Sequence, residues 1–171
     1  MDYPKYGGGW GNEVLYRMCR DQPGHTNSDV IAGKIWLIGR AYAAAVERGA
    51  GKAILREARE KNKGLPELIA LDIAKSALDK WLESIDDVKK VDVENLDRVL
   101  AVHRKFVDLL KGLTKGKRAT RRSFASKYLH FHKPLAFFLF DSRAQEKIHK
   151  KVPRCKLKLP PSWGLPQILL K

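Results

Sequence analysis

The sequence has few cysteines, no long apolar run and no stretch that alternates apolar and polar residues as a β-strand does. Cys19 and Cys155 are its two cysteines, too few for a disulfide framework, a zinc finger or an iron–sulfur cluster. No apolar run approaches the roughly 20 residues that a membrane span needs, and residues 1–10 lack the hydrophobic region of a secretory signal. We therefore expect a cytoplasmic protein with reduced thiols, no bound metal or cofactor, and no membrane anchor.

Acidic residues are nearly absent from the last third of the chain. Residues 109–171 contain 16 Lys and Arg but only two acids, Asp141 and Glu146, whereas residues 1–108 carry 18 basic and 17 acidic residues. Nearly all of the net charge of +15 therefore lies in the last third. Such a one-signed region is typical of a protein that binds a polyanion. We expect nucleic acid as the partner, DNA in preference to RNA, with anionic lipid or an acidic protein as the alternatives.

Helical periodicity predicts an all-α fold, an orthogonal bundle of about six or seven helices. The helix over residues 29–48 is apolar nearly all round, which is typical of a central helix. We expect one domain over residues 1–151, with a mobile segment at 1–11, followed by a proline-rich basic tail at 152–171. The other expected helices cover residues 13–20, 52–61, 66–85 and 96–113, with one more around 125–131 and a last one that begins after Asp141.

The densest apolar run, residues 135–140, ends on a carboxylate, Asp141. An apolar run that stops at an aspartate and resumes as a helix-forming segment predicts an N-cap, here accepting a backbone N–H from Arg143 or Ala144. We expect the run itself to be a short buried connector. A capping carboxylate stays ionised, because helix-terminal N–H groups favour its charged form. This suits electrostatic stabilisation and does not suit a general acid.

The order helix, basic turn, helix, apolar connector, Asp, helix resembles the helix–hairpin–helix DNA glycosylase superfamily. The corresponding residues are Leu113-Thr114-Lys115-Gly116, a helix around 125–131, and the run 137–140 before Asp141. The resemblance implies DNA binding at the hairpin and a catalytic role for Asp141. The segments CRDQPGH, KIWLIGRAYAAAVERG, SKYLHFHKP and FFLFDSRA are also similar to a group of small bacterial proteins that have no assigned activity.

Two features depart from the glycosylase pattern. The turn keeps one glycine, Gly116, and the positions of the nucleophilic lysine in bifunctional members hold Arg121, Arg122 and Ser123. Arginine stays protonated and cannot form a Schiff base, and Lys127 lies too near the aspartate to substitute. The resemblance therefore implies a monofunctional base-excision enzyme. A non-catalytic DNA- or RNA-binding protein and a metal-independent ribonuclease remain open as alternatives, so the sequence does not decide whether the chain is an enzyme.

The glycosylase interpretation assigns roles to a small set of residues. A flipped nucleotide would enter a pocket near Tyr128, His130 or His132, and Asp141 would stabilise the cation that develops on the sugar. The two histidines point about 200° apart on a helix, so they do not predict a metal site. A metal-dependent nuclease would need more carboxylates than the basic third contains. The predicted nucleic-acid contacts are Lys115, Gly116, Lys117, Arg118, Arg121, Arg122 and Lys127.

Overall fold

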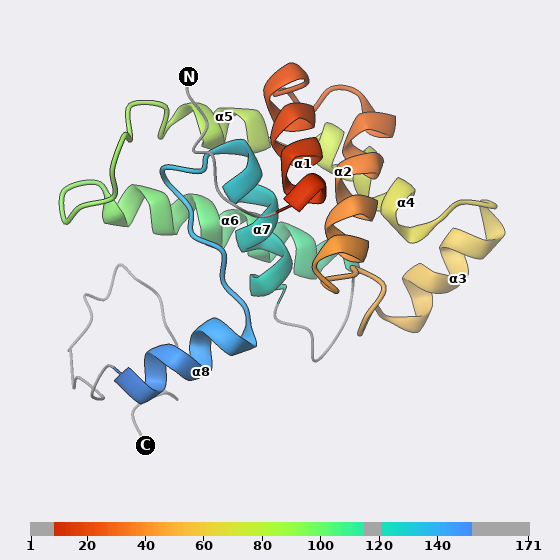
Figure 1. Ribbon diagram of the computed structural model, residues 1–171. Helices are drawn as coiled ribbons and strands as arrows, with labels where there is room; N and C mark the ends of the chain where they lie inside the picture. Colours follow the sequence, from red (N-terminus) through yellow and green to blue (C-terminus); the bar gives the residue numbers. More distant parts are fainter. Residues whose placement is uncertain (1–8, 115–120, 152–171) are drawn as a thin grey trace.

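The computed structural model describes residues 9–114 and 121–151, which form eight helices and no strand (Figure 1). The predicted all-α class is confirmed, with more helices than expected. Within the segment predicted to be mobile, residues 9–11 already belong to the first helix. The tail at 152–171 lies outside the described residues. In chain order the helices are α1 (Gly9–Asp21), α2 (Ser28–Ala41), α3 (Lys52–Glu60), α4 (Leu65–Ala74), α5 (Leu78–Glu83), α6 (Leu96–Thr114), α7 (Arg122–His132) and α8 (Ser142–Lys151).

The helix predicted over residues 29–48 ends early, at Ala41. The backbone N–H of Tyr42 closes the last turn on Ile38 at 3.1 Å, and Ala43 takes a left-handed φ of 50°. The chain then folds back against α2, where a Cβ on Gly39 would lie 3.3 Å from the Cα of Ala45. The missing side chain of Gly39 therefore permits the close return that the helix-favouring sequence did not predict.

The helix predicted over residues 66–85 is also divided, into α4 and α5. Between the two helices, the hydroxyl of Ser76 donates to the carbonyl of Ile73 at 2.7 Å and accepts the N–H of Leu78 at 3.3 Å. A serine side chain that bonds nearby backbone in this way competes with helix hydrogen bonds. The interruption is therefore a local side-chain effect.

The core forms where α2 packs against α4 and where α1, α6 and α7 close around them (Figure 1). Helix α7 is buried along almost its whole length, so it is more central than the sequence indicated. Helix α2 is less enclosed than predicted, because Trp36 is 54% exposed. The large side chains buried at the centre include Leu15, Ile31, Ile35, Ile38, Ile69, Ile73, Phe106, Tyr128 and Phe131.

A buried polar group fastens the loop between α1 and α2 to the core. The ammonium of Lys34, which is fully buried, donates to the carbonyl of Gln22 at 2.5 Å and lies 3.5 Å from Nε2 of His132. The ring of His25 bonds the carboxylate of Asp79 at 2.5 Å, and its backbone N–H donates to the same carboxylate at 3.0 Å. One loop thus joins α2, α5 and α7.

Acid should destabilise this arrangement. Burial lowers the pKa of His25, although Asp79 raises it, and burial holds the pKa of His132 well below 6.5. Below pH 6.5 the unfolded chain therefore binds more protons at these two histidines than the folded chain does. The stability that the neutral histidines contribute is complete above pH 6.5, and the free energy of unfolding falls as the pH drops below it. We expect urea denaturation to show a loss of up to about 1.4 kcal/mol per histidine for each pH unit in that window.

The variant His132→Leu is the control for this pH dependence. It should be less stable at neutral pH, because the Lys34 ammonium no longer has the imidazole nitrogen beside it, but its stability should fall less steeply with acid. Equal slopes for the wild type and the variant would contradict a titrating His132.

Candidate nucleic-acid interface

The described chain from α6 to α8 has the element order that the sequence predicted. Helix α6 ends at Thr114 and α7 begins at Arg122; residues 133–140 then run back along α7, and Asp141 precedes α8 (Figure 1). Lys115, Gly116, Lys117 and Arg118, which were predicted to contact nucleic acid, lie outside the described residues.

Arg121 is buried and faces the interior. It takes a left-handed φ of 57°, and its Nε donates to the hydroxyl of Thr114 at 2.9 Å while Nη1 donates to the carbonyl of Arg48 at 2.8 Å. The N–H of Gly51 bonds the carbonyl of Thr114 at 2.8 Å. Burial lowers the pKa of Arg121, and Glu47 opposes the shift. Arg121 thus joins the end of α6 to the turn after α2, in place of the surface contact predicted for it.

Lys127 is also buried, and it holds the end of the connector. Its ammonium donates to the hydroxyl of Ser123 at 2.8 Å and to the carbonyl of Phe140 at 3.3 Å. The hydroxyl of Ser126 lies 3.0 Å from that same carbonyl and accepts the N–H of Phe140 at 3.1 Å. Burial lowers the pKa of Lys127, and Asp141 raises it. Sequence reasoning missed Ser126 altogether, because no local pattern marks it.

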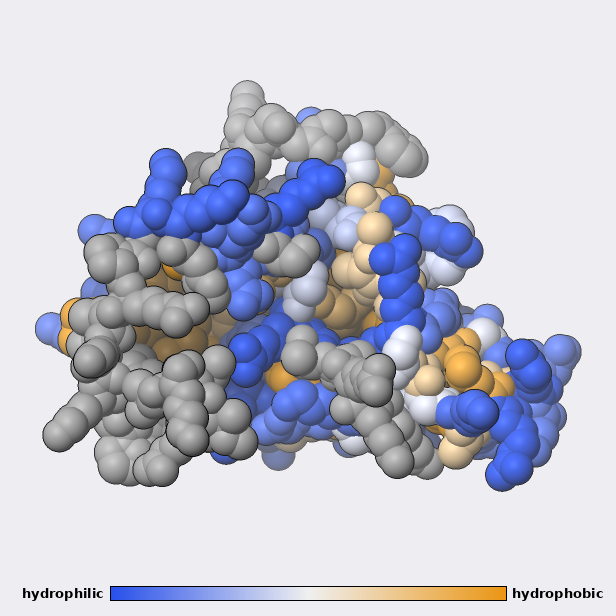
Figure 2. Space-filling model, turned by 90° about the horizontal axis from the view of Figure 1, so that it is seen from below, coloured by the Kyte–Doolittle hydropathy of each residue, from blue (hydrophilic) through white to orange (hydrophobic). Residues whose placement is uncertain are grey.

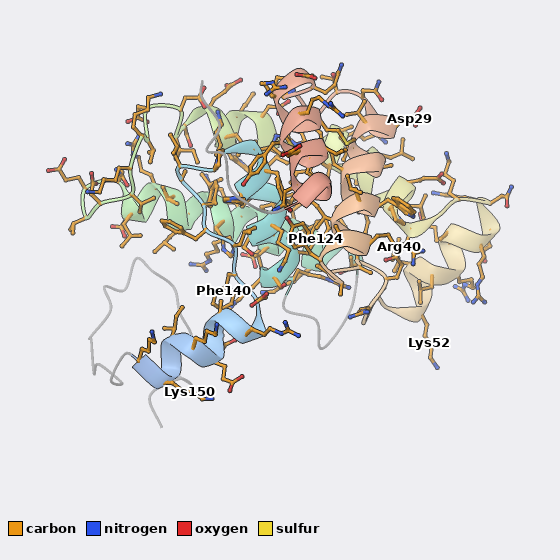
Figure 3. The ribbon with its side chains drawn as sticks, viewed as in Figure 1. Asp29, Arg40, Lys52, Phe124, Phe140 and Lys150 are labelled. Atoms are coloured by element: carbon orange, nitrogen blue, oxygen red, sulfur yellow. The ribbon has the colours of Figure 1, made fainter. Side chains whose placement is uncertain are left out.

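Asp141 caps α8 as predicted, and its Oδ1 accepts the N–H of Ala144 at 2.8 Å. This bond is the first cause of a lowered pKa, so the carboxylate is ionised at neutral pH. The connector before it is only partly buried, which corrects the sequence prediction. Ala136 and Phe137 lie in the core, whereas Phe138 is 72% exposed. The Phe140 carbonyl is held against α7, so the exposed part of the connector ends beside the start of α8 (Figure 3).

The three residues predicted to line a base pocket belong to the core instead. Tyr128 is fully buried and stacks on His132 with ring centroids 5.0 Å apart. His130 is bonded on both sides, at 2.6 Å to the carbonyl of Phe137 and at 2.6 Å to the hydroxyl of Tyr16. Since a carbonyl can only accept, Nδ1 of His130 carries the proton and Nε2 accepts from the tyrosine. Helix α7 therefore offers no described base-reading group.

Exposed cations gather at the first residue of α7 and along α8. Arg122, Arg143, Lys147 and Lys151 are exposed, and within residues 9–114 and 121–151 none of them forms an ion pair. We call these four residues the basic surface. Lys150 lies on the same helix but pairs with Glu146 at 2.6 Å. Figure 3 shows Lys150 on α8 and Lys52 at the start of α3 on the same lower side of the molecule, and hydrophilic residues predominate on that side in Figure 2.

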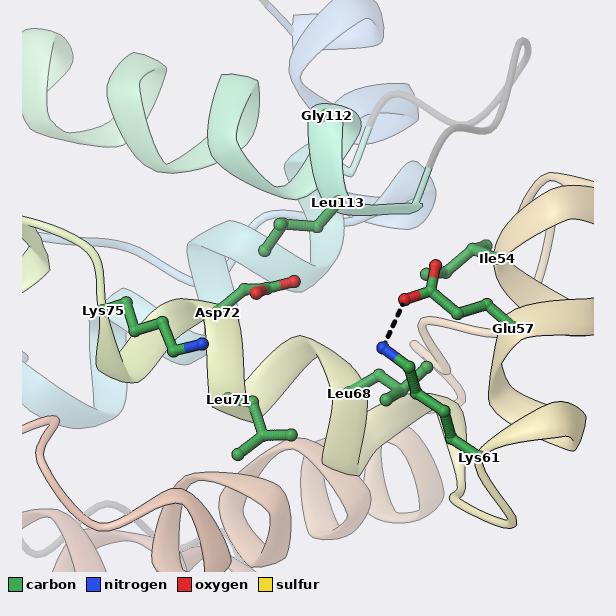
Figure 4. Close-up of a pocket in the computed structure, with 9 residues that line it drawn as sticks. All are labelled: Ile54, Glu57, Lys61, Leu68, Leu71, Asp72, Lys75, Gly112 and Leu113. Atoms are coloured by element: carbon green, nitrogen blue, oxygen red, sulfur yellow. Dashed lines mark hydrogen bonds and ion pairs between the residues drawn. The ribbon is translucent and has the colours of Figure 1, made fainter.

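Two of the hollows on the described surface lie away from Asp141, which lines neither of them. One, of about 230 Å³, lies between α3, α4 and the end of α6 (Figure 4). It carries Glu57, paired with Lys61 at 2.8 Å, and also Asp72 and Lys75. With both signs of charge present, this hollow does not suit a polyanion. The other, of about 350 Å³, lies between the end of α2, the turn after it and the start of α4.

Comparisons with known proteins give no indication of the function of this chain. No family model, curated protein or solved structure matches the chain. The resemblance to helix–hairpin–helix glycosylases therefore stays a prediction. In the described parts of the chain, no three His, Cys, Asp or Glu side chains come together as a metal site. No helix there is both long enough and apolar enough to cross a membrane.

Arg121 and Arg122 are neighbours in the chain, but we expect their substitution to change the free energy of unfolding by different amounts. Arg121→Ala should lower the free energy of unfolding by about 2–3 kcal/mol, because Thr114 and the Arg48 carbonyl lose a charged donor. Arg122→Ala, at an exposed position, should change it by about 0.5 kcal/mol or less. Chemical denaturation of both variants measures the difference. Equal stabilities would contradict the internal role of Arg121.

Proposed function

We propose that this chain is a nucleic-acid-binding domain that holds the phosphate backbone, of DNA in the first instance, on its basic surface. The observation that carries the proposal is the return of the connector along α7. Because Ser126 and Lys127 hold the Phe140 carbonyl, α8 begins beside the first turns of α7. Cations from two helices thereby share one side of the molecule, with no described acid paired to them.

The surroundings of these cations support a phosphate partner. The N-cap residue of α7, Arg121, makes no side-chain capping hydrogen bond, and the backbone N–H groups and dipole at a helix N-terminus favour phosphate oxygens. Helix α8 is exposed on nearly all sides, and a solvated helix of 10 residues gains little stability from its own hydrogen bonds. A polyanion laid along α8 would neutralise its like charges and so stabilise it.

The geometry supports nucleic-acid binding more directly than it supports catalysis. Base excision, the activity that the glycosylase resemblance implies, would need a pocket in which Asp141 meets a sugar. Neither described hollow reaches Asp141, and the α7 side chains expected to contact a base are buried. The ionised carboxylate of Asp141 also accepts the hydrogen bond that caps α8. We therefore confine the proposal to binding, with the phosphate backbone as the element recognised.

Salt dependence of binding to a DNA duplex tests this proposal. We expect the triple variant Arg122→Ala, Arg143→Ala, Lys147→Ala to bind more weakly and to show a shallower dependence of log Kd on log salt. The slope should fall by about 0.9 for each phosphate that the variant no longer neutralises. Fluorescence anisotropy across a salt series measures both quantities.

A control variant removes the same charge from another part of the molecule. Lys80, Lys89 and Lys90 are exposed residues at and after α5, away from α8 in Figure 1. Changing all three to Ala should leave the salt slope close to that of the wild type. Equal losses of affinity in the two triple variants would mean that net charge alone attracts DNA, and would refute a defined basic surface.

A further inference from the structure

The larger hollow, beyond the basic surface, contains the most exposed of the described tryptophans. Trp36 is 54% exposed, and the guanidinium of Arg40 lies over its ring at 5.6 Å from the centroid. Arg48 and Glu47 complete the polar part of the lining, and Ala45 lies on the apolar part. The contact with Arg40 is a cation–π interaction, and more than half of Trp36 stays accessible to solvent beside it.

The hollow is joined to the start of α7 by the buried arginine. Nη1 of Arg121 donates to the carbonyl of Arg48, and Arg48 lines the hollow. Arg122, the first member of the basic surface, is the next residue along the chain. The start of α7 and the lining of the hollow are therefore linked through the side chain of Arg121 and the backbone of Arg48.

We propose that this hollow takes a nucleobase of a single-stranded or locally opened nucleic acid, stacked on Trp36. The proposal rests on the function proposed above and adds a base-contacting site to it. An aromatic face stacks on any base, and a guanidinium plane such as that of Arg40 does the same. The volume of about 350 Å³ falls in the range of small-molecule sites.

The charges in the hollow favour a base over a phosphate as the occupant. Glu47 puts a carboxylate among the lining residues, and this carboxylate repels phosphate oxygens. It can also accept hydrogen bonds from the amino group of a base, as carboxylates do from cytosine. Arg40 stays over the Trp36 ring, and Arg48 is the lining cation left for a phosphate beside the stacked base. A base inside the hollow and phosphates outside it would thus give partners to both the carboxylate and the cations of the lining.

Two single-stranded DNA oligonucleotides of equal length test the inference, one with bases and one made of abasic sites. They carry the same phosphates, so the basic surface contributes equally to both. We expect the wild type to bind the base-bearing strand about tenfold more tightly than the abasic strand. Trp36→Ala should reduce binding of the base-bearing strand to the abasic level, and Trp36→Phe should keep most of the difference.

Phe138→Ala is the matched control, because Phe138 is an exposed aromatic outside the hollow. It should keep the preference for bases. If Trp36→Ala keeps the preference, or if Phe138→Ala alone loses it, the assignment to this hollow is overturned while the basic surface stands. If the wild type binds neither strand at low salt but binds the duplex, the inference is overturned and the proposed function stands; if it binds neither the strands nor the duplex, both fail. Far-ultraviolet circular dichroism confirms that each variant is folded.

Discussion

The guanidinium of Arg121 is the interaction on which the arrangement of this molecule depends. It lies buried between the end of α6 and the turn after α2, and it donates to Thr114 and to the Arg48 carbonyl. Among the described residues its Nη2 is buried without a hydrogen-bond partner, so the bonds of Nε and Nη1 alone offset the cost of burying the charge. The constraint holds the end of α6 and the start of α7 against the turn after α2, and Arg48 of that turn also lines the hollow that contains Trp36.

A second constraint sets the position of α8. Ser126 and Lys127 bind the backbone of Phe140 from inside the fold, and Asp141 then starts the helix by capping it. The cost of burying Lys127, seen in its lowered pKa, is partly offset by the nearby carboxylate. Arg121 and Lys127 serve inside the fold, whereas Arg122 and the cations of α8 stay exposed. One basic segment is thus divided between structural and surface roles.

Local patterns in the sequence predicted the features that depend on neighbouring residues. The Asp141 cap follows from the stop in an apolar run, α6 follows from apolar spacing, and α3 follows from a run of helix-favouring residues. The roles of Arg121 and Lys127 could not be predicted in this way. The carbonyl that Arg121 binds lies 73 positions away in the chain, and a buried arginine looks the same in sequence as an exposed one such as Arg122.

The early end of α2 shows the same limit. Residues 41–48 favour a helix locally, yet contacts of the returning chain with Gly39 override that preference. The end of α2 also leaves Trp36 exposed at an open hollow, although the apolar pattern of the helix predicted that it would be buried in the core. Tertiary contacts thus decided both the base-contacting site proposed here and the burial of the residues that the sequence nominated for that role.

An NMR titration of the isotope-labelled protein with a DNA duplex tests the central claim most directly. If the basic surface holds the phosphate backbone, the changes in backbone amide shifts concentrate at Arg122, Arg143 and Lys147, with little change around Lys89 and Lys90. Changes confined to the loop between α5 and α6, or spread evenly over all exposed cations, would contradict this assignment of the DNA-binding surface.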